Sequence, residues 1–337
     1  MSSPLNEPAA LGYLSCKVQF CLKIRITEPE RSARMVEVNK TGTLTGHSGS
    51  IYALTQGSKP NIVFSGGADG LVAEWNLEEP SEGRLIARLP NSVYALHHLN
   101  DRGQLVIGQN FEGVHLVDYV LKKEMANLKL TESSIFDLLV VENKIFVACG
   151  TGEVIVVDLE SFREAMRFQF SQKSARSIAV NEDKSELAIG YSDEFVRIVD
   201  LKDLTLKQEF RAHSNSVFCV RYSPDGRFLL TGSRDAHLKV WDVSDQYRLV
   251  RDIVAHMYTI NHLDFSPDGK HFVTCSMDKS IKVWDGADFR LLKVIDKARH
   301  AGHGTSVNKL AWTSFNNQLV SASDDRTISI WNIFFKL

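Results

Sequence analysis

The sequence has 337 residues, of which 44% are hydrophobic and 24% are charged, and its formal net charge at pH 7 is −2. A net charge so close to zero excludes a general electrostatic attraction to nucleic acid or to an anionic membrane. No run of about 18 apolar residues occurs, so the sequence predicts no membrane-spanning helix.

Residues 1–34 form a segment of their own. Residues 1–10 are polar with two prolines, and apolar and polar residues alternate over residues 18–26, which is a strand pattern. Lys17 interrupts the apolar part and no basic region precedes it, so a secretory signal peptide is not predicted. We expect an N-terminal extension that is disordered or not part of the native chain, in which case translation begins at Met35.

The next pattern along the chain is a lone predicted strand at residues 36–45. A repeated spacing follows it, in which a histidine precedes an aspartate by 22 residues and a tryptophan by 28 residues. A spacing kept this strictly indicates a structural module copied along the chain. Its four copies are His47, Asp69 and Trp75; His213, Asp235 and Trp241; His256, Asp278 and Trp284; and His303, Asp325 and Trp331.

Three weaker copies fill the interval between Trp75 and His213. They carry Val117, Val157 and Val199 at the tryptophan position and Leu89, Thr131 and Ser171 at the histidine position. The seven copies end at Asn76, Asp118, Asp158, Asp200, Asp242, Asp285 and Asn332, in steps of 42, 40, 42, 42, 43 and 47 residues.

Each copy contains several short strand patterns separated by turns. In residues 217–242, for example, three β-prone runs are separated by the turn Ser223-Pro224-Asp225-Gly226 and by a second turn at Ala236. Four short strands per unit of about 40–45 residues, ending in Trp-Asp, are typical of a propeller blade. The chain resembles the WD-repeat family over about residues 36–337.

This resemblance implies an all-β fold, a seven-bladed β-propeller of four-stranded antiparallel blades. Residues 36–45 are then expected to close the ring as the outer strand of the last blade. Residues 35–337 would form one domain, although the length alone suggests two.

The resemblance also assigns a structural role to the repeated residues. In the family, the histidine, a serine or threonine, the aspartate and the tryptophan of one blade form a hydrogen-bonded chain. The hydroxyl candidates are Ser65, Thr231 or Ser233, Thr274 or Ser276, and Ser321 or Ser323. Four copies of one set argue against catalysis, since an enzyme needs one active site.

Superposing the copies yields three sets of positions, which the resemblance places around the top mouth of the central channel. Three residues after the histidine position, all seven residues are serine or threonine. Five residues after it stand Tyr52, Tyr94, Phe136, Arg176, Phe218, Asn261 and Asn308. Immediately before the aspartate position stand Ala68, Asn110, Gly150, Ser192, Arg234, Met277 and Asp324.

Two interpretations of these sets remain open. The hydroxyls can bond local backbone, and the aromatic rings can fill space between strands. Alternatively, Tyr52, Tyr94, Phe136, Arg176 and Phe218 form a binding patch, because aromatic and arginine side chains dominate binding hot spots. Arg234 and Met277 would extend this patch, and Asp324 would belong to its polar side.

We therefore predict a non-catalytic scaffold, cytoplasmic and without cofactor or metal, that binds a protein or peptide on its top face. The cytoplasmic location rests on Cys149, Cys219 and Cys275, which fall on strand patterns as expected for packed thiols rather than disulfides. We expect a monomeric propeller within a larger assembly, with no membrane contact. The alternatives are an enzyme or small-ligand binder using the channel, and a subunit of a nucleic-acid-associated complex that meets nucleic acid through Arg176 and Arg234.

Overall fold

The computed structural model describes residues 35–81, 83–100 and 102–336. The predictions for residues 1–34, including the alternating strand pattern, lie outside the described residues. Cys149, Cys219 and Cys275 are buried free thiols on strands, as predicted.

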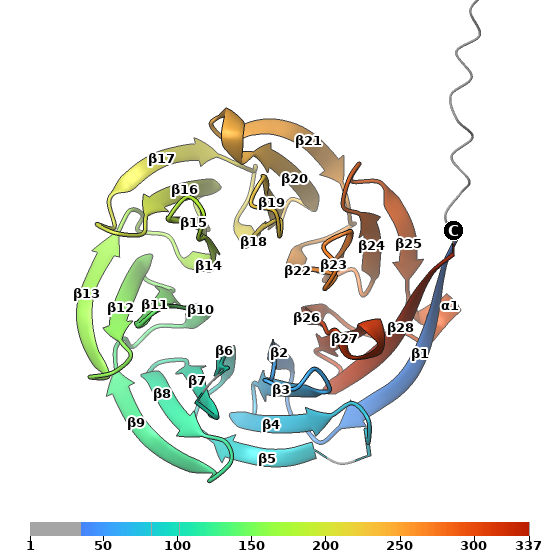
Figure 1. Ribbon diagram of the computed structural model, residues 1–337, viewed down its shortest axis with the longest axis horizontal. Helices are drawn as coiled ribbons and strands as arrows, with labels where there is room; N and C mark the ends of the chain where they lie inside the picture. The colour runs from blue at the N-terminus through green and yellow to red at the C-terminus, as the bar shows by residue number, and fades with distance from the viewer. Residues whose placement is uncertain (1–34, 82, 101, 337) are drawn as a thin grey trace, which may run out of the picture.

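Seven four-stranded antiparallel sheets surround a central channel (Figure 1), so the predicted seven-bladed propeller is confirmed. In blades one to six the strands run outward from the channel in chain order. Blade one is β2 (Ile51–Gln56), β3 (Ile62–Gly67), β4 (Leu71–Asn76) and β5 (Gly83–Arg88); blade two is β6 (Val93–Leu99), β7 (Gln104–Gln109), β8 (Gly113–Asp118) and β9 (Lys123–Lys129); blade three is β10 (Ile135–Val141), β11 (Lys144–Cys149), β12 (Glu153–Asp158) and β13 (Arg163–Gln169). Blade four is β14 (Ala175–Asn181), β15 (Glu186–Tyr191), β16 (Phe195–Asp200) and β17 (Leu206–Arg211); blade five is β18 (Val217–Tyr222), β19 (Phe228–Ser233), β20 (His237–Asp242) and β21 (Arg248–Val254); blade six is β22 (Ile260–Phe265), β23 (His271–Ser276), β24 (Ile281–Asp285) and β25 (Leu291–Ile295).

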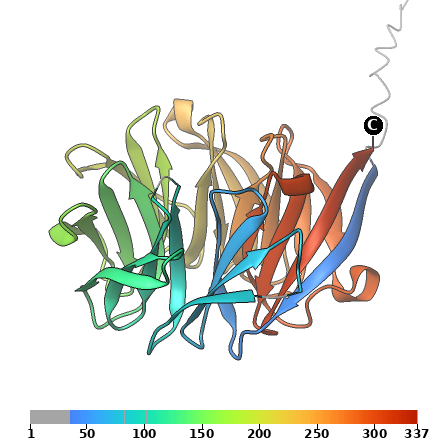
Figure 2. The same cartoon turned by 60° about the horizontal axis from the view of Figure 1, so that its bottom comes forward.

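Blade seven joins the two ends of the described chain. Its strands are β26 (Val307–Trp312), β27 (Gln318–Ser323), β28 (Thr327–Lys336) and β1 (Met35–Thr45). Strand β1 pairs antiparallel with β28 from Met35 opposite Lys336 to Thr45 opposite Thr327, and Figure 2 shows the two side by side at the outer edge. The predicted closure by residues 36–45 is thus confirmed, and it leaves no gap in the ring of sheets.

The apolar core lies between neighbouring blades. Strand β11 has a buried apolar run over residues 145–149, whereas the outer strand β13 is mostly exposed. Blades three and four, which lack the tryptophan, pack through apolar contacts that join Val154 and Val156 to Ile178 and Ile189.

Helical structure is confined to single turns in the described part of the chain: α1 (Lys297–His300), η1 (Val243–Asp245) and η2 (Phe315–Asn317). No helix among the described residues has the length and apolar character needed to cross a membrane.

Candidate functional site

The repeated histidine, aspartate and tryptophan residues form hydrogen-bonded chains inside four blades. In blade one, Ser65 Oγ lies 2.8 Å from His47 Nε2 and accepts the Trp75 Nε1–H at 2.8 Å. His47 Nδ1 lies 3.1 Å from Asp69. Because the Trp75 N–H donates to the hydroxyl, the hydroxyl can donate to Nε2 while Nδ1–H donates to Asp69. Every polar atom of the chain then has a partner.

The same hydrogen-bonded chain is found, with another hydroxyl, in the other three blades that have the strict spacing. The residues that provide it are Thr231, Thr274 and Ser321, at 2.8–3.0 Å from both the histidine and the tryptophan. The alternative hydroxyls have a different role, in which they accept the backbone N–H of the blade's aspartate: Ser233, Ser276 and Ser323.

The aspartate of each chain also anchors backbone at the top of its blade. Asp235 accepts the N–H groups of Ser214 at 2.9 Å and His237 at 3.0 Å. Burial by itself would raise the pKa of Asp235, but the hydrogen bond from His213 and these backbone donors hold it well below its usual range. These residues therefore fix the loops that carry the mouth of the channel.

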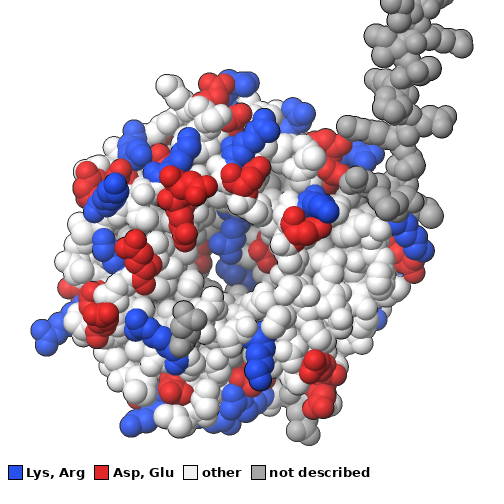
Figure 3. Space-filling model, viewed as in Figure 1, with Lys and Arg blue, Asp and Glu red and all other residues white. Residues whose placement is uncertain are grey.

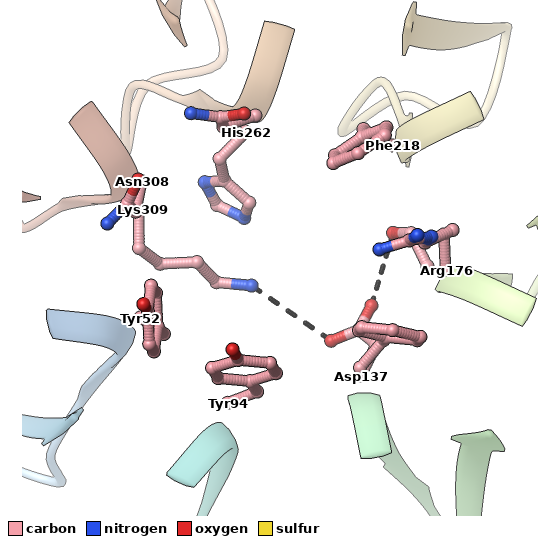
Figure 4. Close-up of a pocket in the computed structure, with 11 residues that line it drawn as sticks. Tyr52, Tyr94, Asp137, Arg176, Phe218, His262, Asn308 and Lys309 are labelled. Atoms are coloured by element: carbon pink, nitrogen blue, oxygen red, sulfur yellow. Dashed lines mark hydrogen bonds and ion pairs between the residues drawn. The ribbon is translucent and has the colours of Figure 1, made fainter. Parts of the chain in front are cut away.

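One residue near the start of every inner strand is bulged out of the pairing with the second strand. In blade one the register shifts between Ile51 and Ala53, and an equivalent shift occurs in the six other blades. The skipped residues are the five-position set: Tyr52, Tyr94, Phe136, Arg176, Phe218, Asn261 and Asn308. A β-bulge bends its strand and changes the direction of a side chain. All seven side chains line one pocket of about 270 Å³, which we call the mouth pocket (Figure 4).

The mouth pocket lies at the end of the channel where the inner strands begin. The blades follow one another clockwise in Figure 1 and anticlockwise in Figure 4, so Figure 4 shows the opposite face.

Five residues of the set make a continuous series of ring contacts, which we call the aromatic arc: Tyr52, Tyr94, Phe136, Arg176 and Phe218. The Tyr52 and Tyr94 rings meet edge to face at 4.3 Å between centroids, and Tyr94 stacks on Phe136 at 6.2 Å. The Arg176 guanidinium carbon lies 4.1 Å from the Phe136 centroid and 4.8 Å from that of Phe218. The rings pack on one another and still keep part of their surface open to the pocket.

The opposite side of the mouth is polar. Asn261 donates to Ser306 Oγ at 2.9 Å and to the Val307 carbonyl at 2.8 Å. Asn308 donates to the Ile51 carbonyl at 3.0 Å and to Asp324 Oδ1 at 2.8 Å. These amides connect blade six to seven and blade seven to one, so Asp324 is held in place beside the pocket.

The serine and threonine set contributes bonds between blades. The hydroxyls of Ser92, Ser174 and Ser216 donate to the carbonyls of Ala68, Gly150 and Ser192, at 3.3, 3.0 and 3.3 Å. Each acceptor stands immediately before the aspartate position of the preceding blade. These three contacts agree with the packing interpretation.

The wall of the mouth pocket contains polar and ionisable residues that sequence reasoning missed. Asp137, Ser177, His262 and Lys309 line it (Figure 4), each one position after a bulged residue. The three superposed sets contain one acid, Asp324, and no histidine, so Asp137 and His262 add groups that those sets lack. Comparing the sixth position after the histidine position in each copy would have found them. In a regular strand, however, successive side chains point to opposite faces, so the sixth residue would not be expected to share a pocket with the fifth.

Asp137 and His262 form bonds to the next blade, and Lys309 extends across the channel towards Asp137. Asp137 accepts from Ser177 Oγ at 3.1 Å and from the Ile178 N–H at 3.0 Å, and Lys309 Nζ lies 4.0 Å from it. His262 Nδ1 accepts the Leu310 N–H at 3.3 Å. Burial lowers the pKa of His262 well below its usual value, so this imidazole is neutral at pH 7.

The rim residues predicted from the sequence lie around the pocket without lining it. Arg234 is exposed, and Met277 is 56% exposed. The Met277 N–H donates to the Thr259 carbonyl at 3.0 Å, which brings the neighbouring loop with Met257 and Tyr258 beside it. Met257 and Tyr258 are 80% and 58% exposed and were not predicted.

The chain is therefore a β-propeller of seven four-stranded blades, with a recessed pocket at one end of its central channel. A family model described as "WD domain, G-beta repeat" matches residues 38–76, 204–242, 247–285 and 296–332, which include the four strict copies. The chain belongs to the WD-repeat β-propeller family.

Several curated proteins are similar to the chain. It is 25% identical to Protein groucho of Drosophila melanogaster over 60% of this chain and 29% of that protein. It is 27% identical to Actin-interacting protein 1 of Drosophila melanogaster, over 64% of this chain and 34% of that protein. It is 22% identical to Striatin-3 of Bos taurus, over 68% of this chain and 32% of that protein. The chain spans about a third of the length of these relatives.

Proposed function

We propose that this propeller is a non-catalytic interaction module that binds a peptide or protein segment at the mouth pocket. The observation that carries the proposal is the convergence of all seven bulged side chains on one pocket. Partly exposed aromatic rings and an arginine supply apolar contact with polar tips, as binding hot spots do. One similar protein is named for its interaction with actin, which agrees with a binding role.

The chemistry of the wall supports binding over catalysis. A general base must be within reach of a substrate proton, but Asp137 and His262 Nδ1 already accept backbone N–H groups from the next blade. Among the described residues, no group of three or more histidine, cysteine or acidic side chains could hold a metal ion.

The test is a random peptide library displayed on phage and selected on the purified protein. Enriched peptides are then titrated against the double variant Phe136→Ala/Phe218→Ala. Loss of the anchors should weaken binding by about tenfold or more. Phe334, which is 48% exposed on β28 and does not line the pocket, provides the matched control Phe334→Ala, which should bind normally. Equal affinity of the double variant and the control, both folded, would contradict the proposal.

A further inference from the structure

The aromatic arc contains a cation without a counterion. Arg176 Nε donates to Ser192 Oγ at 2.9 Å, and the two faces of its guanidinium are covered by Phe136 and Phe218. Among the described residues, no carboxylate lies within ion-pair distance of it. The guanidinium group, which lines the mouth pocket (Figure 4), therefore has no charged partner in the described part of the chain.

Several arginines elsewhere in the ring are paired with carboxylates. Arg84 lies 2.6 Å from Glu74, Arg197 lies 2.8 Å from Asp193, and Arg211 lies 2.7 Å from Glu194. On the opposite face of the ring, shown in Figure 3, many acidic and basic side chains lie close to one another. Leaving a partly buried cation unpaired is unfavourable, and contact with two aromatic rings offsets only part of that cost. Arg176 is half-buried, lines the mouth pocket and has no carboxylate partner, a combination that a bound anion would explain.

A second unpaired cation lies close by. Arg234, on the turn between β19 and β20, has no ion pair in the described part of the chain. Burial is the first cause that lowers the pKa of Arg176, and the charge of Arg234 is the second. The two guanidinium groups repel each other, and an anion between them would remove this repulsion. Lys309 also lines the pocket, but it is not an unpaired cation, because its ammonium group faces the carboxylate of Asp137.

Resting on the proposed function, we infer that the mouth pocket recognises an anionic side chain of the bound peptide through Arg176, assisted by Arg234. The planar guanidinium binds the two oxygens of a carboxylate or of a phosphoryl group in the same forked geometry. The flanking rings of Phe136 and Phe218 hold that fork in place and offer apolar surface to the neighbouring peptide residues.

The pocket favours a peptide over nucleic acid as the source of the anion. Its volume of about 270 Å³ is that of a recess for a side chain, below the roughly 300–1,000 Å³ of sites for larger ligands. Asp324 beside the same mouth would repel a polyphosphate, and the chain as a whole has a net charge of −2. The polar side with Asn261 and Asn308 suits peptide groups.

The test uses four pools of fluorescent nonapeptides with blocked ends. Random residues flank a central glutamate, phosphoserine, glutamine or lysine, and a labelled single-stranded oligonucleotide is added as a fifth probe. Binding to the full chain is followed by fluorescence anisotropy at two salt concentrations. We expect the glutamate or the phosphoserine pool to bind more tightly than the glutamine pool by on the order of tenfold to a hundredfold, and less so at high salt. The tighter of the two identifies the anion as carboxylate or phosphoryl.

Single variants measure the contribution of each guanidinium group to binding, and a control variant shows whether the fold is affected. Arg176→Gln should reduce the preferred pool to the affinity of the glutamine pool, and Arg234→Gln should weaken it to a smaller extent. The matched control is Arg227→Gln: Arg227 also lies over an aromatic ring, 4.8 Å from Phe228, at the other end of blade five. It should bind like the wild type. Unfolding midpoints of all variants establish that they are folded, and Arg234 is exposed, so its substitution leaves the core intact.

The outcomes distinguish this inference from the proposed function. If all four pools bind equally and Arg176→Gln has no effect, the anion site is overturned while peptide binding stands. If no peptide pool binds, both are overturned. If the oligonucleotide alone binds and depends on Arg176, the peptide is the wrong partner.

Discussion

The hydroxyl of Thr231 offers the sharpest test of the hydrogen-bonded chains. Thr231 is fully buried, and its Oγ1 lies 2.8 Å from His213 Nε2 and 3.0 Å from Trp241 Nε1. Thr231→Val keeps the shape of the side chain and removes the oxygen, so both nitrogens lose their partner. An orphaned buried polar group costs about 1–3 kcal/mol, so two of them should lower the free energy of unfolding by about 2–6 kcal/mol.

The control is Thr231→Ser, which keeps the hydroxyl and loses a methyl group. Serine serves in this place in blades one and seven, as Ser65 and Ser321. The loss of a buried methyl costs about 1 kcal/mol. Urea unfolding followed by circular dichroism and tryptophan fluorescence compares the two variants. If Thr231→Val proves as stable as Thr231→Ser, the reasoning about the shared hydroxyl is refuted.

The remaining predictions concern the histidine and aspartate of a hydrogen-bonded chain, a histidine on an inner strand, and the strand that closes the ring. His213→Ala and Asp235→Ala should each lower stability by about 1–3 kcal/mol, and unchanged urea midpoints for both would refute a structural role. His97 lies on β6, the inner strand of blade two. Burial lowers the pKa of its imidazole to about 4, so the unfolded state binds a proton first as the pH falls below about 6.5. Stability should therefore decrease between pH 6.5 and 4, by up to about 1.4 kcal/mol per pH unit from this residue. His97→Gln should reduce the slope of the free energy of unfolding against pH, and an identical slope would exclude His97 as its source. Leu44 of β1 is 1% exposed. If β1 holds the ring closed, Leu44→Ala should lower the free energy of unfolding, measured by thermal unfolding, by about 2–5 kcal/mol. An unchanged free energy of unfolding would show that β1 does not hold the ring closed.

Part of the mouth could be predicted from the sequence because every blade is a copy of the same unit. The strict spacing from His47 to Trp75, repeated from His213 onward, aligned the copies residue by residue. That alignment identified the fifth position after the histidine as one set before any contact was known. The structure then placed the whole set around one pocket.

Local sequence could not decide which of two nearby hydroxyls completes each chain. Thr231 and Ser233 lie on the same strand with the same side-chain direction, two residues apart. The answer depends on which of them pairs with Lys239, two residues before Trp241 on the neighbouring strand, and this is a matter of register. The bulge at each inner strand is likewise a property of strand pairing, and it is what brought Asp137, His262 and Lys309 to the pocket wall.

The sequence by itself determined the number of blades, the strand that closes the ring and the residues that repeat in each blade. The number of copies and the repeated residues follow from periodicity, which is local and additive along the chain, and the closing strand follows from the resemblance to the WD-repeat family. The tertiary structure alone decided that Arg176 lies between Phe136 and Phe218 without an acidic partner. Those three side chains come from three blades, about 40 residues apart along the chain, and only closure of the ring brings their charges and rings within contact distance.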